Sequence, residues 1–219
     1  MASPRTRKRV DRRTRGARAE GSDARATLVA AAAKVFARRG YAGSSMDQIA
    51  EEAGFSKGAL YWHFDSKEDL FFALLEERFD RPLREMAGLL ESAPPDQDMS
   101  PEASRALLDF FAKERETILL DHEFWSLAVR EPKLRARYAR RQTELRDVLA
   151  RALDARQRQL GAPDFATPTE EVATAYLALA TGLAMEKLID PAAVPDHLFG
   201  ETVALVFQGL VARAERDGG

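Results

Sequence analysis

The run GFSKGALYWHFDSK, within the first third of the chain, brings hydroxyl, ammonium, phenol and imidazole groups close together. Ser56 supplies a hydroxyl at the start of a predicted short helix, and Lys57 and Tyr61 stand four residues apart on one side of that helix. Leu60 and Phe64, also four apart, form a separate apolar stripe. Polar groups beside an exposed helix N-terminus are suited to hydrogen bonds and ion pairs with phosphate.

Acid–base and metal chemistry are not indicated elsewhere in the sequence. The three histidines, His63, His122 and His197, are far apart, and none belongs to a pair with zinc-ligand spacing. The chain has no cysteine, which excludes thiolate metal ligands and disulfide bonds. His122 and Glu123 are neighbours in a predicted helix, so their side chains do not face each other. We therefore expect neither an enzyme nor a metal site nor a cofactor.

The composition indicates a globular protein of the cytoplasm. Apolar residues make up 45% of 219 positions, enough for a substantial core. The absence of cysteine is typical of a reducing compartment, and the sequence has no uninterrupted run of about 18 apolar residues. The charged N-terminus lacks the apolar segment of a signal peptide. We expect no membrane association.

Two short helices joined at a glycine carry the phosphate-binding candidates. Ser45, followed three residues later by Gln48, forms a capping box at the start of the first helix, and Gly54 ends it. Ser56 caps the second helix. Two short helices in this arrangement are typical of a helix-turn-helix.

Longer helices flank this pair. An apolar stripe with helical spacing begins after Ser22, a candidate N-cap, and the helix ends at Gly40. Ser66 and Asp69 predict the cap of a fourth helix that is rich in leucine and phenylalanine. We expect part of the Trp62 ring to pack against this fourth helix.

Residues 31 to 70, AAAKVFARRGYAGSSMDQIAEEAGFSKGALYWHFDSKEDL, closely resemble the N-terminal DNA-binding domain of the TetR family of bacterial transcriptional regulators. The resemblance includes the pattern IAxxAGxSxGxLYxHFxSKxxL and covers roughly the first third of the chain. So many positions at fixed spacing are far more specific than a helix-turn-helix pattern alone. Met46 and Asp47 depart from the family pattern, in which threonine or a basic residue is frequent.

The resemblance implies a double-stranded DNA operator as partner, with the third helix in the major groove. It places a helix-turn-helix over the span from Ser45 to Phe64. The residues that it implies at or near DNA are Ser45, Ser56, Lys57, Gly58, Tyr61, His63 and Lys67, and Trp62 of the same helix is a further DNA-binding candidate.

The fold class expected for the whole chain is all-α, with about nine helices. An N-terminal three-helix DNA-binding domain over residues 22–82 precedes a helical domain over residues 83–219. Residues 1–20 carry eight basic and two acidic side chains, which predicts a disordered basic arm over residues 1–21. That arm either contacts phosphates or is a solvated tail. From residue 68 onward 28 acidic residues face 19 basic ones, so this part is not expected to lie on DNA.

The last two predicted helices are rich in small and apolar residues, VATAYLALATGLAM and TVALVFQGLVA. Such stripes allow close helix approach, and two copies would form a four-helix interface. The alternative is that both helices pack into the core of their own subunit. In TetR-like proteins the last two helices usually form the dimer, so the resemblance implies a homodimer that reads a palindromic operator.

The C-terminal domain has many aromatic residues and methionines, which either form its core or line a pocket for a largely apolar or aromatic small-molecule effector. The pocket candidates are Phe79, Phe111, His122, Trp125, Tyr138 and Tyr176. The function expected is therefore a ligand-responsive regulator, most simply a repressor that its effector releases from DNA. A ligand-independent DNA-binding regulator or an architectural DNA-binding protein is the alternative.

Overall fold

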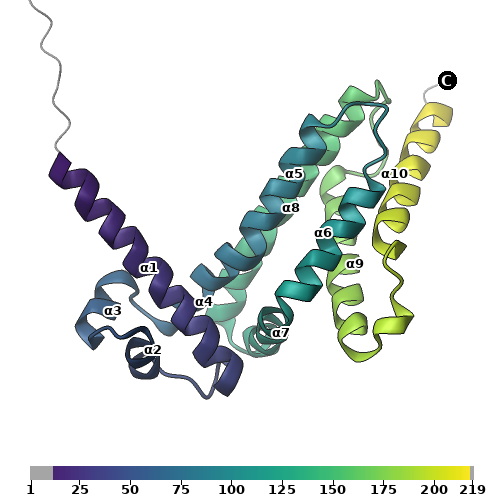
Figure 1. Cartoon of the computed structure of the whole chain (residues 1–219). Coiled ribbons are helices and arrows are strands. Elements are labelled where there is room, and N and C mark those ends of the chain that lie inside the picture. Colours follow the sequence, from purple (N-terminus) through teal and green to yellow (C-terminus); the bar gives the residue numbers. More distant parts are fainter. Residues whose placement is uncertain (1–11, 218–219) are drawn as a thin grey trace, which may run out of the picture. The chain divides into compact units, whose positions relative to one another are not determined.

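The computed structural model describes the backbone of residues 12–217 and the side chains of residues 23–217, and throughout this range the fold is helical without strands (Figure 1). This confirms the expected all-α class. Contacts divide the chain into two compact units, residues 1–74 and residues 75–219. The division falls eight residues before the expected domain end at residue 82.

The N-terminal unit contains four helices, α1 (Arg12–Arg39), α2 (Met46–Ala53), α3 (Lys57–His63) and α4 (Lys67–Leu75). The start of α1 corrects two expectations. Residues 12–21 are helical rather than disordered, and Ser22 lies inside the helix instead of capping it. Four arginines and two alanines make up most of this stretch and favour helix, which outweighs its two glycines. The rest of the expected arm, residues 1–11, lies outside the described residues.

The caps of the short helices agree with the sequence pattern. Ser45 Oγ accepts from the Gln48 N–H at 3.3 Å, and the Gln48 side chain accepts from the Ser45 N–H at 3.0 Å. Gly54 ends α2 with φ 71°, a left-handed conformation that glycine adopts without strain. Ser56 Oγ accepts from the Ala59 N–H at 3.1 Å and opens α3. These local bonds set where both helices begin, independently of the rest of the fold.

The core of the N-terminal unit is an aromatic cluster to which α3 adds its apolar stripe. Phe36, Tyr41 and Phe71 lie with ring centroids 5.3–6.2 Å apart. Leu60 and Phe64 are buried, as their spacing predicts. The buried stripe leaves the opposite side of α3 exposed to solvent.

The C-terminal unit contains α5 (Arg81–Ser92), α6 (Ser100–Lys113), α7 (Arg115–Arg130), α8 (Pro132–Gln159), α9 (Thr169–Ile189) and α10 (Leu198–Asp217), with a short 3-10 turn at Pro191–Ala193. The long helix α8 packs against α5, α7 and α9, whereas α10 packs mainly against α6 (Figure 1). When α4 and α5 are counted as one helix joined by the π segment described next, the described residues contain nine helices, as expected.

A π-helical segment, η1 (Glu76–Asp80), joins α4 to α5 without a break in helical structure. Its wide turn is closed by the Arg81 N–H, which donates to Glu76 O. Pro82 follows directly, and a proline ring clashes with the carbonyl four residues before it in an ordinary α-helix. The wider turn accommodates this proline and brings Asp80 to a buried position.

At one point α10 approaches α6 as closely as a backbone allows. A Cβ at Gly200 would lie 1.9 Å from Ser100 O and 2.4 Å from Ser104 Oγ, so only glycine fits. The Gly200 N–H donates to Ser104 Oγ at 3.0 Å. This contact attaches α10 by its first turn while leaving much of its length uncovered by its own unit.

Candidate DNA-binding surface and ligand cavity

The exposed side of the helix-turn-helix carries most of the residues that the sequence predicts at DNA. Those with exposed side chains or backbone are Ser45, Ser56, Lys57, Gly58, Tyr61 and Trp62, and His63 is half-buried. Trp62 is 78% exposed and rests edge-on against His63, with ring centroids 4.6 Å apart. The expectation that Trp62 packs in part against the fourth helix is therefore wrong, because the buried side of α3 is already occupied by Leu60 and Phe64.

Lys57 has an acidic neighbour on this surface. Its Nζ lies 2.8 Å from an Asp47 carboxylate oxygen and 6.0 Å from the Tyr61 ring centroid. The hydrogen bond to Asp47 raises the pKa of Lys57 above its ordinary value. Met46, the other departure from the family pattern, is buried and belongs to the core. Asp47 is thus a negative charge among groups suited to phosphate.

We expect Asp47→Asn to strengthen operator binding about two- to five-fold, the scale of an exposed ion pair, because Lys57 is then free to meet phosphate. The measurement is an equilibrium titration of operator DNA by fluorescence anisotropy. The gain should vanish when Asp47→Asn is introduced into a Lys57→Gln background. Unchanged or weaker binding by the single variant would contradict this role for Asp47.

Lys67 has a structural role that the sequence analysis did not foresee. Its Nζ donates to Tyr41 O at 2.7 Å and to Ser44 O at 2.9 Å, and lies 4.4 Å from the Tyr41 ring centroid. The ammonium group therefore satisfies carbonyls of the turn between α1 and α2. It ties the start of α4 to that turn, and the expected position of Lys67 at or near DNA stays a prediction.

Lys67→Ala is expected to lower the free energy of unfolding by about 1–3 kcal/mol, because two carbonyls of the turn lose a charged donor. Chemical unfolding followed by circular dichroism measures this loss. Lys57→Ala, which removes an exposed lysine of the same unit, is the matched control and should change stability little. Equal stability of the two variants would show that the Lys67 contacts are not stabilising.

A second pair of contacts holds α2 against α1. Arg38 Nη2 lies 2.5 Å from Glu52 Oε2, and Lys34 Nζ lies 3.8 Å from Glu52 Oε1. The hydrogen bond from Arg38 lowers the pKa of Glu52. Arg25 lies over the Phe64 ring at 5.1 Å. The sequence analysis did not predict these contacts of basic residues of α1, because their partners are distant along the chain.

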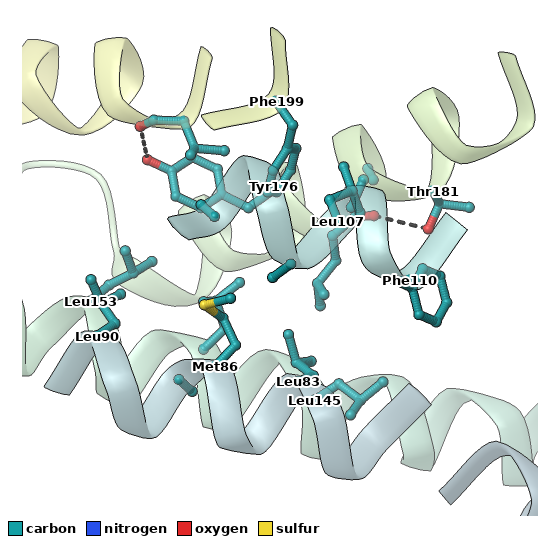
Figure 2. A pocket seen from close by; sticks show the side chains of 18 of the residues that line it. Leu83, Met86, Leu90, Leu107, Phe110, Leu145, Leu153, Tyr176, Thr181 and Phe199 are labelled. Atoms are coloured by element: carbon teal, nitrogen blue, oxygen red, sulfur yellow. Dashed lines mark hydrogen bonds between the residues drawn. The ribbon is translucent and has the colours of Figure 1, made fainter. Parts of the chain in front are cut away.

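The C-terminal unit contains a cavity of about 1360 Å³ that is partly open to solvent and is larger than the roughly 300–1,000 Å³ of ordinary ligand pockets. Figure 2 shows Leu83, Met86 and Leu145 from α5 and α8 on one side of it, facing Leu107 and Phe110 from α6. Side chains of α9 and α10 complete the lining. Its wall is mainly apolar, which suits a hydrophobic molecule.

Five of the six pocket candidates from the sequence line this cavity, namely Phe79, His122, Trp125, Tyr138 and Tyr176. His122 and Trp125 are exposed, and their rings stack at 5.8 Å. Phe111 is not part of the lining, which corrects that candidate. It is buried in a cluster with Ile118 and Ala184, because it follows Phe110 by one position and points to another side of α6.

Two polar groups of the wall are satisfied by the protein itself. The Tyr176 hydroxyl donates to Val203 O at 2.6 Å, and its burial raises the pKa of the phenol (Figure 2). Arg156 donates to four carbonyls in residues 93–97, at 2.7–3.2 Å, and so holds the loop between α5 and α6 against α8. Neither group needs a ligand to complete its hydrogen bonds.

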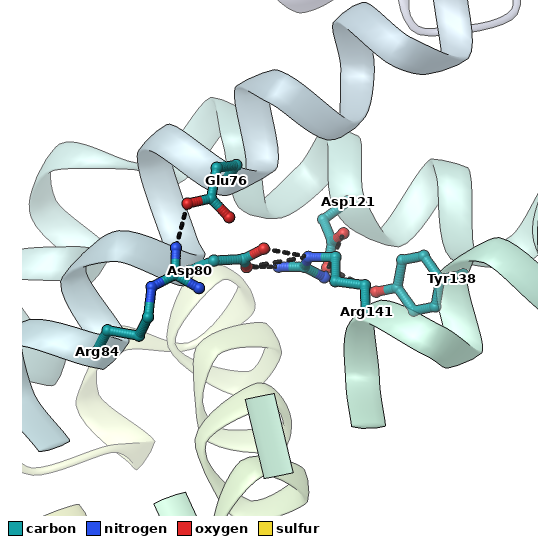
Figure 3. A network of polar contacts seen from close by, with 6 residues as sticks. All are labelled: Glu76, Asp80, Arg84, Asp121, Tyr138 and Arg141. Carbon is teal, nitrogen blue, oxygen red and sulfur yellow. Dashed lines mark hydrogen bonds and ion pairs between the residues drawn. The ribbon is translucent and has the colours of Figure 1, made fainter. Parts of the chain in front are cut away.

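Figure 3 shows a buried polar network that the sequence analysis missed, and three of its residues, Asp121, Tyr138 and Arg141, line the cavity. Arg141 Nε lies 3.0 Å from both carboxylate oxygens of Asp80, and Nη2 lies 2.5 Å from Asp80 Oδ1. Arg141 Nη1 is 3.8 Å from Asp121 Oδ1, and the Tyr138 hydroxyl donates to Asp121 Oδ2 at 3.0 Å. The only sequence signal was an arginine and an aspartate placed among apolar helix positions.

Asp121 is the residue of this network whose charge is least compensated. Its Oδ1 is buried and accepts no hydrogen bond from any group in the described part of the chain. Burial raises the pKa of Asp121, and the charge of Asp80 adds to this effect, whereas Arg141, Tyr138 and His122 oppose it. The folded protein therefore holds a proton on this carboxyl more readily than the unfolded chain does.

The raised pKa gives a pH-dependent stability. Between the unfolded pKa of Asp121, 3.8, and its higher folded value, the native state binds more protons, so stability falls as pH rises through this window. We expect Asp121→Asn, which keeps an acceptor for the Tyr138 hydroxyl, to be more stable than the wild type at neutral pH. The difference should shrink below pH 3.8. Urea unfolding at several pH values measures it, and a constant difference would contradict the assignment.

In the part of the chain that the structure describes, no group of three or more histidine, cysteine, aspartate or glutamate side chains is placed to hold a metal ion. Among the described helices, α9 alone is long and apolar enough to cross a membrane by length and composition. A helix that packs against another subunit can have the same composition. The expected lack of membrane association stays a prediction.

An exposed helix-turn-helix in one unit and a large apolar cavity in the other define a DNA-binding regulator with a ligand-binding domain. The sequence profile described as "Bacterial regulatory proteins, tetR family" matches residues 28–74. The profile described as "BetI-type transcriptional repressor, C-terminal" matches residues 101–206. The chain belongs to the TetR family of bacterial transcriptional regulators, a family of regulators and not of enzymes.

Individual relatives support the same assignment. The transcriptional activator FasR of Mycolicibacterium smegmatis is 32% identical over 124 residues, 56% of this chain and 55% of FasR. The regulator TtgR of Pseudomonas putida is 44% identical over 57 residues, 26% of this chain and 27% of TtgR. The chain thus spans about half and about a quarter of the length of these curated relatives. The crystal structure of the multidrug binding protein EbrR complexed with ethidium aligns with a TM-score of 0.60 at 25% identity, covering 83% of this chain and 96% of EbrR.

Proposed function

We propose that the protein is a ligand-responsive repressor that binds a palindromic operator as a homodimer and is released by a small, largely apolar molecule. The observation that carries the proposal is the large apolar cavity in the unit that follows the helix-turn-helix. Helical structure runs unbroken from Lys67 to Ser92, so the cavity wall in α5 is continuous along the chain with α4 of the DNA-binding unit. A regulator of this kind acts on DNA in the cytoplasm.

The profile that matches the C-terminal unit supports a repressor rather than an activator. The profile that matches residues 101–206 is described as that of a repressor, and these residues include most of the cavity wall. FasR, an activator by its description, matches only about half of its own length. EbrR, a multidrug binding protein with ethidium in its crystal structure, supports a small-molecule effector.

DNA contact is proposed for the exposed residues around α3. Lys57 and Tyr61 form one exposed face, and the backbone of Gly58 is open, with only Ser56 Oγ as near as 4.0 Å to the position of a Cβ. A helix of seven residues contacts few base pairs, so two copies on a twofold axis are needed to read an operator of useful length. For the basic segment before α1, we propose phosphate contacts that add affinity without sequence preference.

Homodimerisation is proposed through α9 and α10, whose outer faces are apolar and uncovered. Ala175 is exposed on α9, Leu205 and Val206 are 68% and 43% exposed on α10, and none of the three lines the cavity. Small residues on α9 permit a close helix contact, and the leucine and valine add apolar area. An apolar surface of this kind is unfavourable in water unless a second subunit covers it.

Leu205→Glu is expected to convert the dimer to a monomer at micromolar concentration, because a charge would be buried in the interface. Sedimentation equilibrium provides the measurement. Leu89→Glu, at a leucine of α5 that is 57% exposed, is the matched control and should leave the dimer intact. A wild-type monomer, or a dimer in the Leu205 variant, would contradict the proposed interface.

The proposed function is tested by footprinting on DNA that flanks the gene, followed by a screen of apolar and aromatic compounds for release of that DNA. We expect a near-palindromic footprint and at least one compound that weakens binding by about 5–150-fold. Because coupling is reciprocal, the same compound must bind the DNA complex more weakly by the same factor. Binding to DNA that no compound changes would favour the ligand-independent alternative.

A further inference from the structure

Arg156 of α8 holds the loop between α5 and α6 from inside the C-terminal unit. Its side chain is buried, and Nη1 donates to Ala93 O at 3.2 Å and to Pro94 O at 2.7 Å. Nη2 donates to Pro95 O at 3.1 Å and to Gln97 O at 2.7 Å. Four carbonyls within five residues share one guanidinium, whose charge strengthens each hydrogen bond. Loss of this single side chain would therefore release the whole loop at once.

The loop leads directly into α6, and α6 carries α10. Gly200 lies so close to α6 that a Cβ at this position would be 1.9 Å from Ser100 O. Ser104 Oγ accepts from the Gly200 N–H at 3.0 Å and donates to His197 O at 3.2 Å. Because α10 packs mainly against α6, the two helices form one body, which we call the α6–α10 pair.

The cavity separates the α6–α10 pair from α5 and α8. Figure 2 shows Leu83 of α5 and Leu145 of α8 on one side of the cavity and Leu107 of α6 on the other. The helix α9 packs mainly against α8, and a hydrogen bond from the Tyr176 hydroxyl to Val203 O joins it to α10. The α6–α10 pair can therefore shift relative to α5 and α8 without separating a closely packed core between them.

The proposed dimer face includes residues from both sides of this division. Ala175 is exposed on α9, whereas Leu205 and Val206 are exposed on α10. A shift of the α6–α10 pair relative to α8 and α9 would move the two parts of the face against each other. The position of the pair thus sets the shape that a second subunit meets.

We propose that the α6–α10 pair moves as one body about the loop of residues 93–99, and that Arg156 is the positioning residue that holds the pair and so sets the shape of the dimer face. The proposal goes beyond the proposed function and rests on it only for the identity of the dimer face. Arg156 and Gln97 also line the cavity, so a molecule in the cavity can contact the groups that hold the loop.

The test measures distances between pairs of spin-labelled cysteines by double electron–electron resonance, because the chain has no cysteine of its own. Asp147→Cys on α8 with Arg213→Cys on α10 reports the distance across the division. Arg105→Cys on α6 with Arg213→Cys reports the distance within the pair, and all three positions are exposed. Labelled chains are diluted with unlabelled protein so that a dimer carries labels on one subunit only.

The distances are compared between the wild type and two variants of Arg156. In Arg156→Met, which removes the four hydrogen bonds, we expect the α8–α10 distance to shift by about 2–5 Å, the scale of a helix displacement between two packed states. The α6–α10 distance should stay unchanged. Arg156→Lys should give a smaller shift in the same direction, because an ammonium group has three donors for four carbonyls. It carries the test if Arg156→Met does not fold.

Arg151→Met is the matched control, because Arg151 is an exposed arginine of the same helix. Both distances should stay as they are in the wild type. An α8–α10 distance that is unchanged in both Arg156 variants would overturn the proposal. An equal change in the α6–α10 distance would also overturn it, because the two helices would then not move as one body.

Sedimentation equilibrium of the unlabelled proteins measures the effect on the dimer face. We expect Arg156→Met to weaken the dimer about 2- to 30-fold, the scale for a residue that acts on a site through other groups, and Arg156→Lys to restore part of the loss. A dimer of wild-type affinity together with a shifted α8–α10 distance would refute the role of Arg156 in setting the face. A wild-type monomer would instead refute the proposed dimer, while the two distances would still decide whether the pair moves as one body.

Discussion

The buried ion pair between Arg141 and Asp80 is the contact on which the cavity of the C-terminal unit depends. It joins the end of the π segment to the middle of α8, and the walls contributed by α5 and α8 begin beside it. Two charges removed from water are costly, so such a pair is retained only with good geometry and added hydrogen bonds. Here Arg141 makes three short contacts to one carboxylate and lies 5.7 Å from the ring centroids of Phe79 and Tyr138.

The π segment explains how Asp80 reaches this position. Within this wider turn Asp80 is buried, while Glu76, one turn earlier, is exposed and pairs with Arg84 of α5 (Figure 3). The ring of Pro82 would clash with the carbonyl four residues before it in an ordinary α-helix, and the wider turn avoids this clash. Helical structure nevertheless continues from the DNA-binding unit into the cavity wall, and this continuity makes a ligand effect on DNA binding physically reasonable.

In the DNA-binding unit, side chains that form the core and side chains that face solvent lie within a few residues of each other on α3. Leu60 is fully buried and Trp62, two positions later, is 78% exposed. The two lysines of this region differ in the same respect. Lys67 is bound to carbonyls of the turn after α1, whereas Lys57 is exposed beside Asp47. An ammonium group serves either purpose, so residue type alone does not distinguish them.

Local patterns in the chain are enough to predict the helical class, the caps at Ser45 and Ser56 and the burial of Leu60, because capping and amphipathic spacing involve residues at most four positions apart. Five of the six pocket candidates chosen from the sequence also line the cavity, since several aromatic side chains lie around it. The contacts of Lys67, whose acceptors lie 26 and 23 residues away, and the pairing of Asp80 with Arg141, 61 residues apart, could be found only in the folded structure. Such contacts depend on how the helices pack against one another, so patterns among neighbouring residues cannot predict them.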